Sequence, residues 1–272
     1  MTRLAEYADA RELTVNLTLR ELRSRYKRSA LGWTWSLLNP LSTVIVFSIV
    51  FAFFLKVRPP VGNPSGLHNF AMFLLCGLLP FSFLSNGMNA SLDSLLANSN
   101  LIRKVYFPRE VLVVSSILSL LVTLLVELGV LCVLLLLFGN MVLPWIPVLL
   151  ALVAIETVFV LGIGLMLSVL NVYFRDVKHF IGIALQALFY SAPIVYPISF
   201  VQDAANRTSF PVLRVYTLNP LVRFIDAYRA VLYDLRFPAL SDVLYITAWA
   251  IAMLALGLFV FRRLDGRLAE EV

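Results

Sequence analysis

The chain has 272 residues, of which 60% are hydrophobic and only 14% charged, and its mean hydropathy is +0.88. This composition excludes a water-soluble globule and indicates one integral membrane domain. The formal net charge of +6 could suggest a nucleic-acid partner. The basic residues instead stand in short clusters beside apolar runs, where orientation in the membrane explains them, so we expect no nucleic-acid binding.

Residues 1–35 form a mostly polar segment, predicted to be cytoplasmic, that contains an amphipathic helix over residues 9–28. One apolar stripe recurs there at helical spacing and consists of Val15, Leu19, Leu22 and Tyr26. The cations off this stripe are Arg20, Arg23, Arg25, Lys27 and Arg28. The pattern is typical of a helix lying in the membrane surface with its cations at anionic headgroups. Leu13 and Leu17 fall on another side, where a protein neighbour could cover them.

The remaining residues, 36–272, contain six apolar windows that are predicted to span the membrane as helices. These windows are 36–55, 70–92, 111–138, 145–170, 180–197 and 242–261. The fifth is the weakest, because Gly182, Pro193 and Pro197 predict a short or kinked helix.

The distribution of Lys and Arg orients the six predicted spans. With the N-terminus inside, the cytoplasmic segments carry 15 basic residues and the external segments carry 7. Five of those seven lie in the long segment 198–241, where they count for less. Both termini are therefore predicted to be cytoplasmic.

Two segments between the spans have helical signals of their own. In 98–109, Asn98 or Ser99 could cap a short cytoplasmic helix that ends before Pro108. In 198–241, Asn219 and Pro220 mark a strong helix start. The apolar stripe that follows consists of Leu221, Ile225, Tyr228 and Leu232. We expect an external helical cap that rests on the bilayer or dips into it.

The motifs of catalysis are missing from the sequence. No Gly-x-x-x-x-Gly-Lys-Ser/Thr loop is present, so any ATP must be bound by another subunit. His68 and His179 fall on opposite sides of the predicted membrane and cannot form a shared metal site or a catalytic relay. Cys76 and Cys132 lie far apart within apolar runs. We expect no catalytic residues, no metal and no cofactor on this chain.

Two acids, Glu127 and Glu156, lie within predicted spans, at similar expected depth. Ionisable groups are costly in lipid and often serve transport, including proton relay. Alternatively, each is protonated or hydrogen-bonds across the helix hairpin and only fastens it. Aromatic residues are also abundant, and they could stack on sugars, form an interfacial belt or simply pack the helices.

Five short segments, taken in their order along the chain, resemble the membrane permeases of ATP-binding-cassette (ABC) exporters of lipid-linked polysaccharide, such as O-antigen, teichoic acid and galactan exporters. They are YKRSALGWTWSLLNPL (26–41), LIRKVYFPR (101–109), NVYFRDV (171–177), PIVYP (193–197) and NPL (219–221). The resemblance runs almost from end to end. It implies an all-α, type-two ABC exporter fold with six transmembrane helices, an N-terminal interface helix and external gate helices between spans five and six.

The resemblance also implies partners and a location. The chain would form a homodimer in the bacterial plasma (inner) membrane, with a separate ABC ATPase subunit that binds ATP and magnesium docked beneath each copy. The residues expected to couple to that ATPase are Leu101, Ile102, Arg103, Lys104, Tyr106, Phe107, Arg109, Arg175 and Asp176. Positive-inside anchoring explains the three cations of 98–109 equally well, and Arg175 could instead pair with Asp176.

A lipid-linked glycan would enter beside Arg25, Lys27 and Arg28. Its candidate path is lined by Phe47, Phe51, Phe189, Tyr190, Tyr196, Trp33 and Trp35, although the two tryptophans could equally be interfacial anchors. The gate would include Asn219, Pro220 and Tyr228. Two alternatives stay open: a permease for drugs or small lipids of the same superfamily, and a proton-coupled carrier that uses Glu127 and Glu156.

Overall fold

The computed structural model describes residues 3–25, 34–54, 56, 59–105, 107–206 and 212–268. Within these residues all regular secondary structure is helical, as the sequence predicts. The elements, in which η marks a short 3-10 or π segment, are α1 (Arg3–Arg25), α2 (Thr34–Phe47), η1 (Ser48–Phe54), α3 (Phe70–Ala97), α4 (Ser99–Lys104), α5 (Glu110–Leu137), η2 (Leu143–Trp145), α6 (Ile146–Tyr173), α7 (Val177–Ser191), α8 (Ser199–Asn206), α9 (Val212–Thr217), α10 (Pro220–Arg229), η3 (Ala230–Asp234), α11 (Leu240–Leu264) and η4 (Asp265–Arg267).

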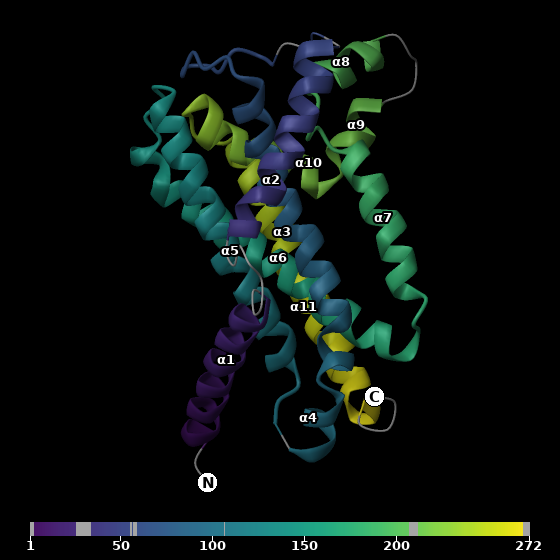
Figure 1. The fold of residues 1–272 in the computed structure, drawn as a ribbon. Helices are drawn as coiled ribbons and strands as arrows, with labels where there is room; N and C mark the ends of the chain where they lie inside the picture. The colour runs from purple at the N-terminus through teal and green to yellow at the C-terminus, as the bar shows by residue number, and fades with distance from the viewer. Residues whose placement is uncertain are drawn as a thin grey trace.

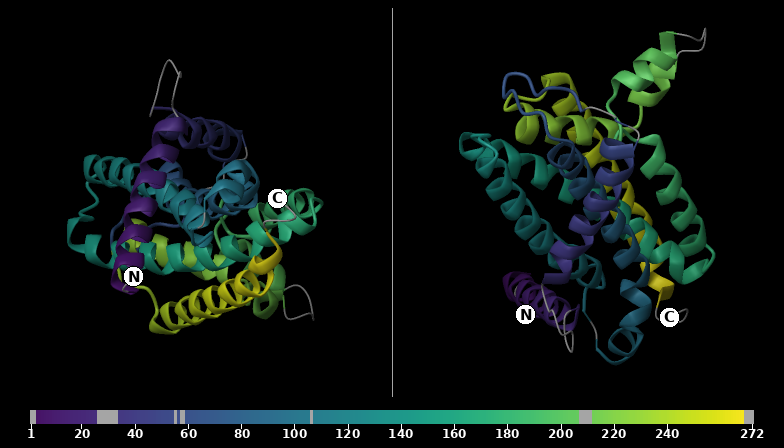
Figure 2. Two further views of the ribbon diagram at one scale, coloured as in Figure 1. Left: turned by 90° about the horizontal axis from the view of Figure 1, so that it is seen from below. Right: turned by 45° about the horizontal axis from the view of Figure 1, so that its top comes forward.

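The long helices run along one axis of an elongated bundle (Figure 1). Both chain termini lie at one end, together with α1 and α4, and we call this the terminal end. Helices α8, α9 and α10 lie toward the opposite end, which we call the distal end. Seen with the top of the molecule tilted forward, α8 and α9 project beyond the bundle (Figure 2).

Four of these helical segments are long and apolar enough to cross a membrane. They lie at Phe70–Ala97, Glu110–Leu137, Leu143–Tyr173 and Leu240–Leu264. A 28-residue helix such as α3 is about 42 Å long, more than the roughly 30 Å hydrocarbon core of a bilayer. The other two predicted windows also contain helices, but shorter ones. In the first, α2 is followed by the π segment η1, and in the fifth, α7 has 15 residues.

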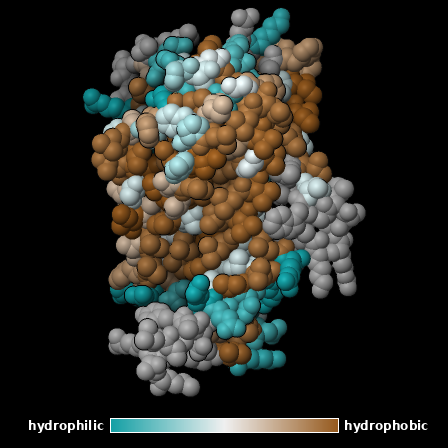
Figure 3. Space-filling model, turned by 90° about the vertical axis from the view of Figure 1, so that its left-hand side faces the viewer, coloured by the Kyte–Doolittle hydropathy of each residue, from teal (hydrophilic) through white to brown (hydrophobic). Residues whose placement is uncertain are grey.

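The surface of the bundle has the hydropathy pattern of a membrane protein. Figure 3 shows a broad apolar belt between hydrophilic residues at both ends. Large apolar side chains remain exposed along the middle of the bundle, including Val133 at 57% and Ile251 at 62%. Exposure of this extent costs free energy in water and is favourable in lipid, so the belt matches the composition of the chain.

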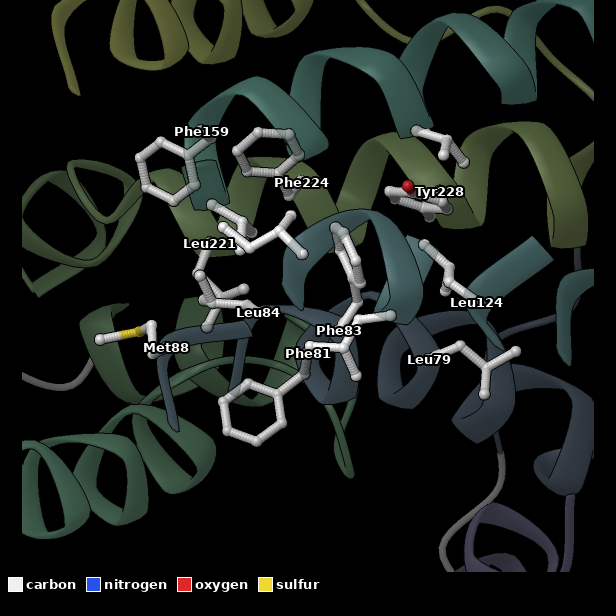
Figure 4. Close-up of a cluster of buried hydrophobic side chains, with 14 of the residues drawn as sticks. Leu79, Phe81, Phe83, Leu84, Met88, Leu124, Phe159, Leu221, Phe224 and Tyr228 are labelled. Atoms are coloured by element: carbon white, nitrogen blue, oxygen red, sulfur yellow. The ribbon is translucent and has the colours of Figure 1, made fainter. Parts of the chain in front are cut away.

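The core forms around α3, which packs against α5, α6 and α10. The Asn69 side chain begins α3 by accepting hydrogen bonds from the amides of Ala71 and Met72. Apolar side chains from the four helices then interlock, as Figure 4 shows for Phe83, Leu124 and Phe159. This packing places α10 inside the bundle, although the helix carries charged residues.

Helix α6 packs most extensively on α11, and glycine makes the close crossing possible. A Cβ atom on Gly162 would overlap the backbone of Met253 and Leu254, and one on Gly257 would overlap Gly162. Small residues at helix crossings are typical of membrane bundles, because the backbones can then approach closely.

Helix α1 packs against the bundle through the side that carries Leu13 and Leu17, not through the predicted apolar stripe. Leu17 is buried and Leu13 packs partly against the core, where α1 contacts α5. The predicted protein neighbour for these two leucines is therefore α5. Val15 and Leu19, on the predicted membrane stripe, remain exposed at 51% and 43%.

Replacement of Gly162 by alanine should destabilise the protein by about 1–3 kcal/mol, because two helix backbones must separate to admit the new methyl group. Gly182→Ala in α7 is the matched control, since its Cβ would meet open space. Thermal unfolding of both variants in detergent checks this expectation. Equal stability of the two variants would contradict the close crossing.

Candidate coupling region, aromatic cluster and distal helices

Helix α4 forms a compact projection at the terminal end of the bundle, within the segment predicted from the sequence (Figure 1). Asn98 stands at its N-cap, but the side chain makes no capping hydrogen bond. The Asn98 Nδ2 instead donates to the Ser94 carbonyl at 2.9 Å, and its Oδ1 accepts from Arg20 Nη2 at 2.6 Å. Asn98 therefore joins α1 to the connection between α3 and α4.

The other side of this connection is joined to the C-terminal part of the chain. Arg109 Nη1 donates to the backbone carbonyl of Asp265 at 2.5 Å and to its carboxylate at 2.9 Å. The Tyr173 hydroxyl donates to the Leu264 carbonyl at 2.9 Å, which ties the end of α6 to the end of α11. These bonds link elements far apart in sequence into one platform at the terminal end.

The candidate coupling residues divide into an anchored set and an exposed set. Ile102 and Phe107 are buried and hold the projection on the bundle, and Leu101 is half-buried. Arg103 and Lys104 are exposed at the end of α4. The residues Ile102, Arg103, Lys104, Val105, Phe107 and Arg109 surround a shallow cavity of about 240 Å³.

The second predicted coupling loop lies at the start of α7. Arg175 and Asp176 are both exposed, and the structure as described shows no ion pair between them. The exposed pair that does form here joins Lys178 to Asp93 of α3 at 2.8 Å. Tyr106 lies outside the described residues.

Four of the candidate path residues meet in one aromatic cluster. The Phe47 ring lies 5.7 Å from Phe51 and 5.9 Å from Phe189, and the Phe189 ring lies 5.2 Å from Tyr190. The cluster joins α2 and η1 to α7, and Phe70 and Phe81 of α3 complete it. The sequence analysis missed these two α3 rings, because a phenylalanine in an apolar span is by itself ordinary core.

The remaining path and entry candidates have different surroundings. The Tyr196 hydroxyl donates to the Tyr190 carbonyl at 2.9 Å and lies 3.3 Å from the Tyr216 hydroxyl. Trp35 is 47% exposed at the start of α2. Arg25 is the last residue of α1, and its side chain lies outside the description. Lys27, Arg28 and Trp33 also lie outside the described residues.

Helices α2 and α7 also carry apolar faces that none of the other described elements covers. On α7, Phe180 and Ile183 are each 69% exposed and Tyr190 is 65% exposed. On α2, Ile45 and Val46 are each 58% exposed. These faces can be solvated only by lipid or by another protein surface.

The start of α10 has the structure that the sequence predicts. The Asn219 side chain accepts a hydrogen bond from the Leu221 amide at 3.0 Å, and Pro220 is the first helical residue. The stripe of Leu221, Ile225 and Tyr228 is at most 3% exposed. This stripe therefore faces the core, as Figure 4 shows for Leu221 and Tyr228.

Polar bonds fasten α10 deep in the bundle. The Tyr228 hydroxyl donates to the Glu156 carboxyl at 2.6 Å, so this acid has its partner in α10. Arg229 Nη2 donates to the Ile194 carbonyl at 2.8 Å, and the guanidinium carbon lies 3.6 Å from the centre of the Phe73 ring. Glu127 lines a small cavity between α2, α3 and α5. The sequence analysis did not single out Arg229.

The sequence of this helical bundle, with its α4 projection and distal helices, matches a known class of transporter. Residues 12–233 match the ABC-2 type transporter family, and the chain belongs to that family. It is 28% identical to an O-antigen export system permease protein, RfbA, of Myxococcus xanthus, over 96% of both chains. It is 30% identical to RfbA of Klebsiella pneumoniae, over 95% of this chain and 94% of the relative. A polysialic acid transport protein, KpsM, of Escherichia coli is 23% identical over 93% and 94%.

Replacement of Tyr228 by phenylalanine should destabilise the protein by about 1–3 kcal/mol, because it leaves the buried Glu156 carboxyl without its donor. Glu156→Gln keeps an acceptor oxygen for the tyrosine and should cost less. Thermal unfolding in detergent measures both changes. A larger loss in Glu156→Gln than in Tyr228→Phe would contradict this ordering.

Proposed function

We propose that this chain is the channel-forming permease of an ABC exporter that moves lipid-linked polysaccharide across the bacterial plasma membrane. The end-to-end similarity to O-antigen and polysialic acid export proteins is the observation that carries the proposal. The cargo would be of the O-antigen, capsule, teichoic acid or cell-wall galactan class. A separate ABC ATPase would bind ATP and magnesium, and this chain would contribute shape and gating but no covalent chemistry.

In this proposal the chain crosses the membrane six times. Helix α2 with η1 provides the first crossing and α7 provides the fifth, in addition to the four long spans. An even number of crossings agrees with the position of both termini at one end of the bundle (Figure 1). The excess of Lys and Arg in the segments at that end supports a cytoplasmic location for both termini.

The ATPase would dock on α4 and on the loop before α7. Arg103, Lys104, Arg175 and Asp176 offer exposed charges at these two places. Through Asn98 and Arg109, a push on the α4 projection would reach α1 and the end of α11 as well as the adjoining spans α3 and α5. Closure of two ATPase subunits on ATP would move this platform and open the channel, and hydrolysis would reset it.

Two copies of the chain would form the channel. The uncovered apolar faces of α2 and α7 support a partner at this side of the bundle. The aromatic cluster of Phe47, Phe51, Phe189 and Tyr190 lies on the same two helices and would offer ring faces to sugars. Helices α8, α9 and α10 would form the external gate.

The geometry gives less support to the alternatives. A proton-coupled carrier needs acids along a shared path, whereas Glu156 is 1% exposed and is bonded to Tyr228. An exporter of drugs or small lipids would have the same architecture, so the choice of cargo rests on the relatives.

Co-purification with a cognate ABC ATPase tests the proposal directly. The expected result is a stable complex whose ATP hydrolysis is stimulated by a lipid-linked glycan and less by drugs or free phospholipid. Stable isolation without any ATPase, together with transport that needs no ATP, would exclude the proposal.

Lys104→Glu should weaken the complex with the ATPase by roughly ten-fold, because it replaces an exposed cation of the expected docking surface with an anion. Arg214→Glu, in α9 at the distal end, makes the same change in net charge and should leave assembly intact. The ratio of ATPase to permease in the purified complex measures both effects. Equal losses in the two variants would place the ATPase elsewhere.

A further inference from the structure

A cavity of about 300 Å³ opens at the distal end of the chain, and we call it the distal cavity. It lies between α3, with the connection before it, and the elements α8, α10, η3 and α11. Six of its lining residues matter here: Phe73, Ser199, Gln202, Asp226, Arg229 and Tyr233. Its volume is at the lower end of the range for small-molecule sites, about 300–1,000 Å³, and has room for one or two sugar rings.

A donor and an acceptor without partners distinguish the distal cavity from an ordinary surface hollow. Arg229 is 7% exposed, and its Nε is buried without an acceptor in the described part of the chain. Asp226 lies one helical turn earlier on α10, and among the described residues its carboxylate has no hydrogen-bond or ion-pair partner. A buried donor without an acceptor is expensive, and the partly exposed Asp226 carboxylate beside it is open to a ligand or to water in the cavity.

The other charges around the distal cavity are already neutralised in pairs. Arg236 Nε lies 3.0 Å from the Asp234 carboxylate, and Arg223 pairs with Asp242. The distal cavity therefore offers one free carboxylate and one buried guanidinium, and its remaining charges balance, which favours an uncharged ligand that both donates and accepts hydrogen bonds. Burial raises the pKa of the Asp226 carboxyl to about 6, against the opposing effect of Arg229.

We propose that the distal cavity binds an uncharged sugar unit of the exported glycan. Sugar hydroxyls both donate and accept, so one hydroxyl can donate to Asp226 while a neighbouring oxygen accepts from Arg229. Tyr233 adds an aromatic wall, and the α8 residues Ser199 and Gln202 add polar groups at the exposed side. Helix α8 projects from the bundle (Figure 2), and its exposed residues Ser199 and Gln202 stand at the opening, where a chain end or branch of a polymer could enter.

This inference rests on the proposed function, but sugar binding can be measured apart from the ATPase. The test uses the purified chain in nanodiscs, with saturation-transfer NMR against methyl glycosides of glucose, galactose, mannose and rhamnose. Methyl glucuronoside is the charged comparator. The expected result is saturable binding of at least one neutral glycoside in preference to the glucuronoside.

Two variants assign such binding to the distal cavity. Asp226→Asn should weaken it by about ten-fold, because a charge-assisted hydrogen bond is lost. Ser199→Trp fills the cavity from an exposed position and should abolish binding, whereas Phe200→Trp, the next residue, does not line the cavity and should leave binding unchanged. Ser199 and Phe200 are both exposed, so their replacement by tryptophan should leave the thermal unfolding temperature unchanged.

Three results would overturn the inference: no binding of any neutral glycoside, preference for the glucuronoside, or full binding in Ser199→Trp. If the same preparation still assembles with its ATPase and responds to a lipid-linked glycan, the proposed function survives that failure. If assembly with the ATPase fails while neutral glycosides bind, the distal cavity is a sugar site on a protein of another function.

Discussion

A polar group that is buried in the core of this bundle is cut off from water and must find its partner within the protein. This constraint applies most strongly to α10, because its Tyr228 and Arg229 side chains are buried against α3 and α6. Glu156 accepts from the tyrosine, and the Ile194 carbonyl and the Phe73 ring receive the guanidinium. These bonds hold a distal helix firmly against the spans, while α8 and α9 project freely beyond it (Figure 2).

Hydrogen bonds and close packing hold some parts of the molecule more tightly than others. At the terminal end, Asn98 and Arg109 bind α1 and the C-terminal part of the chain to the α4 projection, so a force on α4 is shared by several helices. Between the ends, α6 and α11 cross with their backbones in close contact at Gly162 and Gly257. The less tightly held elements are α2 and α7, whose exposed apolar faces and aromatic cluster lie where a second copy and a polymer would be met.

Much of this could be predicted from one sequence, because lipid imposes simple rules. Apolar length located the four long apolar helices α3, α5, α6 and α11, and Asn219 with Pro220 located the start of α10. Pairings between distant segments could not be predicted, because nothing local in the sequence indicates that Glu156 meets Tyr228 or that Arg109 meets Asp265. On the predicted stripe of α1, Val15 and Leu19 are exposed, Tyr26 lies outside the described residues, and the docking side, with Leu17, became clear only when α5 was in place.

Transport in proteoliposomes that contain this chain and its ATPase tests the central claim most directly. The measurement is the movement of a fluorescent lipid-linked glycan across the bilayer with ATP present, with ATP absent, and with a protonophore added. The account predicts movement that requires ATP and is unchanged by the protonophore. Movement that a proton gradient drives without ATP, or without the ATPase, would contradict it.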